Sequence, residues 1–163
     1  MKKLILILAL LGFILNGSGQ KVVTTNVAAD NLVTDGVFNT ACGAGNWACG
    51  DGWAIAGGTA NATATTGNLN TVASPLTVDE YYQLTFTISD YTGGTVRIHA
   101  GASGVGTYRS ANGTYTQVIK CATNGIVYIH GGTAFTGKLD DVSVVKYSSA
   151  GRPLTYSGKV LTK

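Results

Sequence analysis

Charged residues and proline are scarce in this chain of 163 residues. Asp, Glu, Lys and Arg together make up 12% of it, proline occurs 2 times, and Glu80 is the only glutamate. These shortages exclude a highly charged disordered chain and a collagen-like chain. The formal net charge is only +3 and no basic cluster follows the N-terminus, so we expect no nucleic-acid partner.

Residues that favour exposed helix faces are equally rare, whereas glycine occurs 23 times and threonine is nearly as common. Threonine suits strands and glycine suits tight turns, while both disfavour helices. The composition therefore predicts an all-β protein, with one compact domain for a chain of this length.

The first nineteen residues differ from the rest. Lys2 and Lys3 precede an apolar run over residues 4–15, and small residues follow up to Gly19. This pattern is typical of a signal peptide, so we expect residues 1–19 to be a hydrophobic signal helix cleaved after Gly19. The alternative is a retained anchor or packed helix, but the run is shorter than the ~20 residues of a membrane-spanning helix, so no permanent membrane span is expected.

Export would place the protein outside the cell or on the cell surface. In an oxidising compartment, Cys42 and Cys49 are close enough in sequence to close a short disulfide loop. The loop-entropy model gives such a bridge about 2 kcal/mol of stabilisation. Cys121 is left unpaired, and we expect it to be a buried thiol because it lies in an alternating apolar run.

Residues 31–147 alternate apolar and polar side chains in short runs separated by turn residues, which predicts half-buried strands. Eight or nine strands fit an antiparallel two-sheet β-sandwich, and the runs at residues 82–88 and 96–100 are predicted to form a hairpin. The other expected strands are 53–56, 60–65, 69–72, 107–110, 115–121, 126–130 and 139–146.

The segments on either side of this domain lack a clear pattern. Residues 20–30 are expected to be a linker. Residues 148–163 contain Gly151, Pro153 and Gly158 and are expected to be a flexible tail or a strand donated to a neighbouring copy, which would allow self-assembly.

Catalytic side chains do not occur in a convincing arrangement. Asp140 and Asp141 are adjacent on an expected strand, so their carboxylates leave opposite faces and cannot flank one glycosidic bond. His99 and His130 lack a neighbouring motif that marks a nucleophile. We therefore expect a non-catalytic protein.

A binding face is easier to support. Arg97 and His99 alternate with the apolar residues of one strand, as Tyr128 and His130 do on another, so all four share the outward parity. Aromatic faces bury the apolar side of a sugar ring, and guanidinium and imidazole groups bind its hydroxyls. These four residues are the predicted ligand-binding patch if their strands share a sheet. The alternative is that they are isolated polar residues on a solvated face.

The remaining aromatic residues are weaker candidates. Trp53 begins an expected strand and is predicted to anchor the core, while Trp47 lies inside the Cys42–Cys49 loop and is either buried or exposed. Tyr91 and Tyr108 are at turn positions near the expected loop end of the molecule.

A metal site is the last hypothesis drawn from the residues. Asp140 shares parity with Val142 and Val144, so we expect it to point inward, where a carboxylate needs a partner. Calcium is a suitable cation, with oxygens of the loop from Asp35 to Asn39 as further ligands. The alternative is a carboxylate that accepts backbone N–H groups.

Four segments follow one another in a familiar order: residues 31–38 (NLVTDGVF), 52–60 (GWAIAGGTA), 82–86 (YQLTF) and 137–144 (GKLDDVSV). They resemble a known family, the carbohydrate-binding-module jelly rolls of the galactose-binding-like superfold. The resemblance is greatest to modules of phage tail and head fibres and of bacterial secreted proteins. It implies two antiparallel sheets face to face and a structural calcium held by Asp140 with Asp35, Gly36 or Asn39. The family commonly has an acidic residue where this chain has Asn39, which weakens the calcium inference.

Together, these observations predict an exported glycan-binding or surface-adhesion module. The rival hypothesis is a structural module of a phage virion or fibre, or of a self-assembling surface protein. The fold alone does not choose between them.

Overall fold

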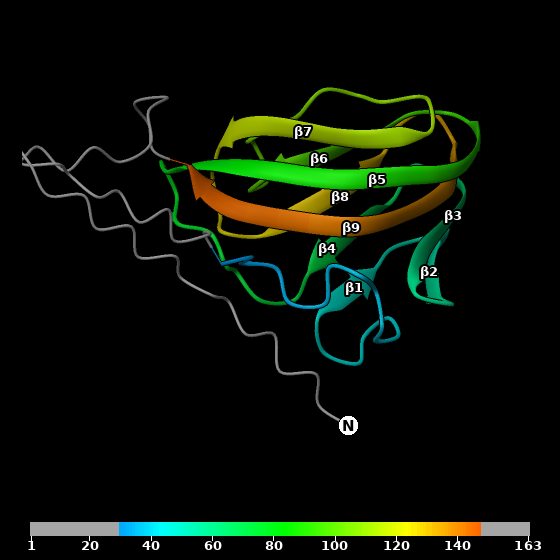
Figure 1. Cartoon of the computed structure of the whole chain (residues 1–163), viewed down its shortest axis with the longest axis horizontal. Coiled ribbons are helices and arrows are strands. Elements are labelled where there is room, and N and C mark those ends of the chain that lie inside the picture. The colour runs from blue at the N-terminus through cyan, green and yellow to red at the C-terminus, as the bar shows by residue number, and fades with distance from the viewer. Residues whose placement is uncertain (1–29, 148–163) are drawn as a thin grey trace, which may run out of the picture.

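The computed structural model describes residues 30–147, which form an all-β sandwich of nine strands. The strands pair antiparallel in two sheets that lie face to face, as Figure 1 shows, with β5, β7 and β9 in front of β6 and β8. The predicted fold class is confirmed. The strands are β1 (Trp47–Cys49), β2 (Trp53–Ala56), β3 (Thr59–Thr65), β4 (Asn68–Thr71), β5 (Tyr81–Gly93), β6 (Val96–Ala100), β7 (Gly113–Lys120), β8 (Val127–Gly131) and β9 (Phe135–Tyr147).

One sheet has four strands in the order β1-β4-β8-β6, and the other has five in the order β2-β3-β9-β5-β7. Alternation by two sends one set of side chains from each sheet into a shared core. Phe86 and Val144 of the five-stranded sheet and Ile98 of the four-stranded sheet are all 0% exposed. The residues between them on each strand therefore form the two outer faces.

The predicted hairpin of residues 82–88 and 96–100 is wrong. β5 pairs with β7 and β9, whereas β6 pairs with β8, so the short link after Gly93 crosses from one sheet to the other. Gly94 has φ 75°, and a Cβ there would collide with the carbonyl oxygen of Thr133. Alternation shows which side of a strand is buried but not which strand is its neighbour.

One further strand prediction is wrong, and one strand has no counterpart among the predictions. Residues 107–110 form no strand; Arg109 makes an isolated bridge with Val96, and Val105 makes one with His99. Backbone bonds such as Gly106 N–H to the carbonyl of Ile98, at 3.0 Å, keep this segment against β6. β1 has only three residues and was not predicted, because so short a run shows little alternation.

The inward direction expected for Asp140 is also wrong. The register between β5 and β9 shifts between the pairs Thr85↔Ser143 and Thr87↔Asp140, and Asp141 there has φ 53°. This bulge puts Leu139 and Val142 both into the core and leaves Asp140 partly exposed. The extra residue reverses the parity on which the prediction depended.

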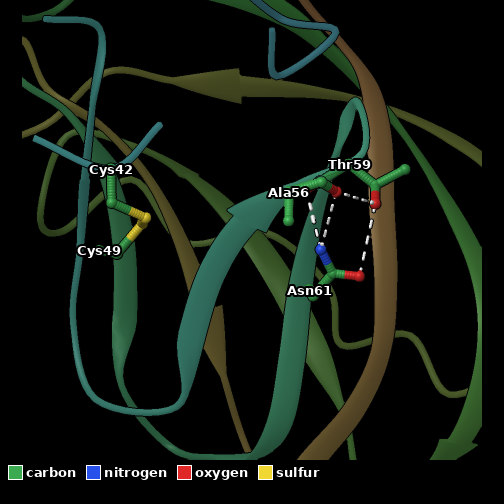
Figure 2. The surroundings of a disulfide bond; sticks show 5 residues. All are labelled: Cys42, Cys49, Ala56, Thr59 and Asn61. Atoms are coloured by element: carbon green, nitrogen blue, oxygen red, sulfur yellow. Dashed lines mark hydrogen bonds between the residues drawn. A yellow bond between two sulfur atoms is a disulfide. The ribbon is translucent and has the colours of Figure 1, made fainter. Parts of the chain in front are cut away.

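Cys42 and Cys49 form a disulfide with their Cα atoms 5.6 Å apart, at the position shown in Figure 2. Trp47, inside the loop that they close, is buried; its Nε1 donates to the carbonyl of Asp35 at 3.0 Å, and its ring lies 5.1 Å from that of Phe38. The open question about Trp47 is thus answered in favour of burial.

The other tryptophan and the third cysteine are buried as expected. Trp53 is 6% exposed, and its Nε1 donates to the carbonyl of Gly67 at 3.1 Å. Cys121 is free and buried, and burial raises the pKa of its thiol. A raised pKa keeps a thiol protonated and unreactive at neutral pH.

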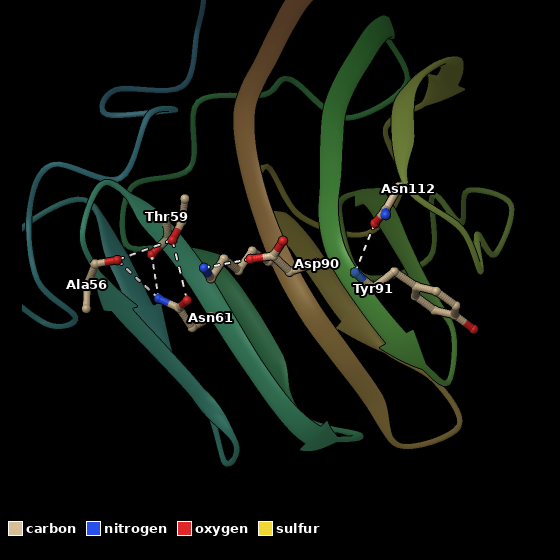
Figure 3. A network of polar contacts seen from close by, with 7 residues as sticks. Ala56, Thr59, Asn61, Asp90, Tyr91 and Asn112 are labelled. Atoms are coloured by element: carbon tan, nitrogen blue, oxygen red, sulfur yellow. Dashed lines mark hydrogen bonds and ion pairs between the residues drawn. The ribbon is translucent and has the colours of Figure 1, made fainter.

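Polar side chains link the strands and turns of the five-stranded sheet, as Figure 3 shows. The side-chain amide of Asn61 donates to the carbonyls of Ala56 and Thr59, each at 3.1 Å, and the N–H of Tyr91 donates to Asn112 at 2.9 Å. The carboxylate of Asp90 is paired with Lys138 at 2.7 Å. The bonds of Asn61 hold the turn between β2 and β3, and the ion pair joins β5 to β9.

The predicted signal helix at residues 1–19 and the tail at residues 148–163 lie outside the described residues, as does the linker up to residue 29. In the described part, residues 30–147, no helix is long and apolar enough to cross a membrane.

Candidate functional site

The four predicted binding residues lie on two neighbouring strands of the four-stranded sheet. β6 and β8 pair Arg97 with His130 and His99 with Tyr128, on either side of the core pair Ile98 and Ile129. Since Ile98 and Ile129 are buried between the sheets, the alternating side chains leave the outer face. The condition set by the sequence, that both strands share a sheet, is met.

These side chains line a hollow of about 330 Å³ on the outer face of the four-stranded sheet, which we call the β6–β8 hollow. Its lining residues are Asn68, Arg97, His99, Ala102, Tyr128 and His130. The turn after β6 forms one side of the hollow, because the N–H of Ala100 donates to the carbonyl of Gly104 at 2.8 Å and folds the chain back.

Aromatic and cationic groups are packed closely around the hollow. The Cζ atom of Arg97 lies 4.3 Å from the ring centroid of Tyr108, and the ring of Tyr108 lies 6.4 Å from that of His130. His99 is 5.9 Å from His130 and 6.5 Å from Tyr128, centroid to centroid. Tyr108 is 42% exposed, which leaves part of its ring free to contact a ligand.

Hydrogen bonds hold two of the side chains in place. Nδ1 of His130 lies 2.8 Å from the side-chain oxygen of Asn68, and the side-chain amide of Asn124 donates to the hydroxyl of Tyr128 at 3.1 Å. Asn68 belongs to β4, so three strands position the site. A site fixed by neighbouring side chains needs little reordering when a ligand binds.

Two other polar atoms at the site have no partner within the described residues. They are Nε2 of His99 and Nε of Arg97, both of which are buried. His99 is only 7% exposed, although its strand parity places it on the outer face. Buried polar atoms without a partner are uncommon in folded proteins.

Both histidines are neutral at pH 7. Burial and, secondarily, the charge of Arg97 lower the pKa of His99 to about 4. Burial and the charge of Arg97 also lower the pKa of His130. Among residues 30–147, no carboxylate lines the hollow, and with both histidines neutral the guanidinium of Arg97 supplies its positive charge.

Asn68 and Ala102 line the hollow although the sequence did not indicate them, and Tyr108, a weaker candidate, lies beside it. Asn68 starts β4, and its pairing with His130 joins residues far apart in the chain. Tyr108 enters the site because residues 104–109 fold back along β6. Tyr91, ranked with Tyr108, has a structural place instead: its hydroxyl donates to the carbonyl of Gly94 at 2.9 Å.

The predicted calcium ligands are used differently by the chain. The carboxylate of Asp35 accepts the N–H groups of Asn39 at 2.7 Å and of Thr40 at 2.9 Å. Partial burial raises the pKa of Asp35, but these hydrogen bonds outweigh it and leave the pKa below its ordinary value. A carboxylate oxygen of Asp140 accepts the N–H of Asp141 at 2.7 Å.

Residues 30–147 contain no group of three or more His, Cys, Asp or Glu side chains placed to hold a metal ion. Calcium binding stays a prediction. The alternative raised for Asp140, a carboxylate that accepts a backbone N–H group, describes its observed bond, and Asp35 accepts two such bonds.

No family model matches the chain, and no curated protein matches it. Among solved structures, 7 chains are similar to it. One of them, titled "CBM4 structure and function", has a TM-score of 0.47 and 16% sequence identity over 71% of this chain and 99% of that chain. A proposal for the function of this chain therefore rests on the side chains around the β6–β8 hollow.

Proposed function

We propose that the chain is an exported, non-catalytic module that binds a glycan or a polysaccharide surface through the β6–β8 hollow. The observation that carries the proposal is that one hollow gathers Arg97, His99, Tyr128 and His130, with Tyr108 stacked on Arg97 beside it. These are aromatic faces and hydrogen-bonding groups side by side.

This combination suits a sugar because a pyranose ring has both an apolar and a polar surface. An aromatic ring buries the apolar C–H groups, and in this hollow Tyr128 offers such a ring with a fixed hydroxyl. The edge-on hydroxyls of the sugar need donors and acceptors, which Asn68 and the imidazole of His130 supply. Water satisfies such groups when the site is empty.

The size of the hollow also agrees with a saccharide. Its volume of about 330 Å³ is at the lower end of small-molecule sites, which favours one or two sugar units over a larger ligand. The hollow lies on an open sheet face, so a sugar within a longer polymer can enter without its chain ends. We therefore infer a polysaccharide or a glycan-bearing surface as the partner.

A glycan array on residues 20–163 tests the proposal, with Tyr128→Ala as the site variant. We expect a glycan signal that the Tyr128→Ala change removes. Tyr81→Ala is the matched control, because Tyr81 lies on β5 in the other sheet, and we expect it to bind like the unaltered chain. Thermal unfolding of both variants shows that they remain folded.

Absence of binding to every glycan would contradict the proposal. If the same chain then assembled into ordered oligomers or filaments, the structural-module hypothesis would be favoured. Residues 148–163, which that hypothesis needs for contacts between copies, lie outside the described residues, so the assembly arm also compares the chain with and without them.

A further inference from the structure

The proposed glycan site contains a positive charge that no acidic side chain of the site neutralises. Arg97 lines the hollow together with Asn68, Ala102, an aromatic residue and two histidines, and none of these is acidic. The ion pairs of the described residues all involve lysines elsewhere, namely Lys120 with Asp79, Lys138 with Asp90 and Lys146 with Glu80. The guanidinium of Arg97 is thus available to an external anion.

The contact of Arg97 with Tyr108 is not a hydrogen bond. Cζ of Arg97 lies 4.3 Å from the ring centroid of Tyr108, and a cation–π contact is an attraction between the positive charge and the ring face that uses none of the N–H donors. Nε, one of the donors of the guanidinium fork, is buried without a partner. A planar carboxylate or a sulfate oxygen pair matches such a fork by two parallel hydrogen bonds.

His99 adds a second unpaired nitrogen beside the same charge. Its Nε2 is buried without a hydrogen-bond partner, and the side chain is 7% exposed. In the tautomer that carries its proton on Nε2, His99 donates this N–H to an acidic oxygen, and a hydrogen bond with a charged partner is about twice as strong as one with a sugar hydroxyl. An anionic group then satisfies Arg97 and His99 together.

We infer that the β6–β8 hollow recognises an anionic saccharide residue, whose acidic oxygens bond Arg97 and His99. This inference rests on the proposed function and narrows its ligand class. The acidic group has two sources, the carboxylate of a uronic acid and the sulfate ester of a sulfated sugar. Tyr108 and Tyr128 contact the ring of the same sugar in either case.

Such a ligand makes binding depend on pH. The titratable and charged groups that face His99 are Arg97 from its own strand and Tyr128 and His130 from β8. Tyr108, from the folded-back segment, lies beside Arg97 and His130. Burial and, secondarily, the charge of Arg97 keep His99 and His130 neutral in the free protein. A bound anion offsets that charge and raises both pKa values, so the complex takes up protons and affinity rises as the pH falls.

The test compares uronic-acid oligosaccharides, the same oligosaccharides with their carboxyls reduced to alcohols, and sulfated oligosaccharides, by isothermal titration calorimetry. We expect an acidic oligosaccharide to bind about tenfold more tightly than its neutral counterpart. We also expect that affinity to increase between neutral pH and about pH 5, with proton uptake, while binding of the neutral sugar stays level. The uronic and sulfated arms identify which acidic group is bound.

Arg97→Gln should abolish the preference for the acidic sugar. Arg109→Gln is the matched control, because Arg109 also stacks on a tyrosine, with its Cζ 4.9 Å from the ring of Tyr115, but does not line the hollow. Equal or tighter binding of the neutral oligosaccharides would overturn the inference and leave the proposed function standing. Failure to bind any saccharide, acidic or neutral, would overturn the proposed function itself.

Discussion

The guanidinium of Arg97 lies over the ring of Tyr108, with its Cζ 4.3 Å from the ring centroid. The two residues come from different stretches, one from β6 and the other from the segment that returns along it. The contact fixes the direction of the guanidinium and holds an exposed aromatic ring at the edge of the β6–β8 hollow. One pair therefore serves both the charged and the apolar part of the proposed sugar site.

Removal of this ring should weaken glycan binding. Tyr108→Ala removes the stacking partner of Arg97, and we expect about a tenfold loss of affinity. This corresponds to about 1.4 kcal/mol, within the range of free energies that cation–π contacts contribute. Tyr108→Phe keeps the ring and should bind nearly as well as the unaltered chain. Titration calorimetry on both variants measures the difference, and equal affinities for Ala and Phe would contradict a role for the ring.

Acid should destabilise the fold through His99. Its pKa is about 4 in the folded chain and near 6.5 when unfolded, so the unfolded state binds more protons between these values. The stability is therefore complete above about pH 6.5 and decreases as the pH falls toward 4, by at most about 1.4 kcal/mol per pH unit for one proton. The free energy of unfolding, measured with urea at each pH, should fall less steeply with decreasing pH for His99→Gln than for the unaltered chain. An identical pH dependence would mean that His99 does not control the loss of stability.

A methyl group at Gly36 should disrupt the packing of the first loop on β9. A Cβ at this position would overlap the carbonyl oxygen of Val142, whose N–H also donates to the carbonyl of Gly36 at 2.8 Å. We expect Gly36→Ala to lower the free energy of unfolding by about 1–3 kcal/mol. Gly93→Ala is the control, since nothing lies within 4 Å of a Cβ there, and it should change stability by less than about 0.5 kcal/mol. If denaturant titrations gave the same change in unfolding free energy for both variants, the loop around Gly36 would be able to move away and accommodate the methyl group.

The bond between Cys42 and Cys49 should contribute through the short loop that it closes. Replacing both cysteines by serine is expected to cost about 2 kcal/mol of unfolding free energy in the loop-entropy model. Cys121→Ser is the comparison, because it replaces a buried cysteine that forms no disulfide and so shows the effect of serine substitution alone. If reduction of the unaltered chain left its unfolding midpoint unchanged, the bridge would have no stabilising role.

The two hypotheses for Asp35 predict different responses to calcium. As an acceptor of the N–H groups of Asn39 and Thr40, it stabilises the loop by itself, and Asp35→Ala should cost about 1–3 kcal/mol in EDTA and in calcium alike. As a calcium ligand, it would raise the unfolding temperature of the unaltered chain in calcium, and the substitution would remove that rise. Thermal unfolding in both solutions decides between them.

Much of the fold was predictable because the core repeats with a period of two. Tyr82, Leu84, Phe86 and Ile88 alternate with polar residues on β5, and all four are buried. The same regularity identified the outward residues of β6 and β8. Period-two burial depends only on local backbone geometry, so it can be read from neighbouring residues.

What could not be predicted depends on contacts between distant residues. The partner of β6 is β8 and not β5, and no local signal records that choice. The bulge at Asp141 reversed the parity of Asp140, since one extra residue shifts every later position. Tyr108 joined the site through the return of residues 104–109 along β6, a pairing too short to show a periodic pattern.

The order of the four-stranded sheet has a consequence for the integrity of the hollow. Asn68 and His130 are bonded neighbours although 62 residues separate them along the chain. A fragment that ends before β8 lacks Tyr128 and His130, and one that begins after β4 lacks Asn68. The proposed sugar site therefore needs a nearly complete domain, since neither fragment carries all of its groups.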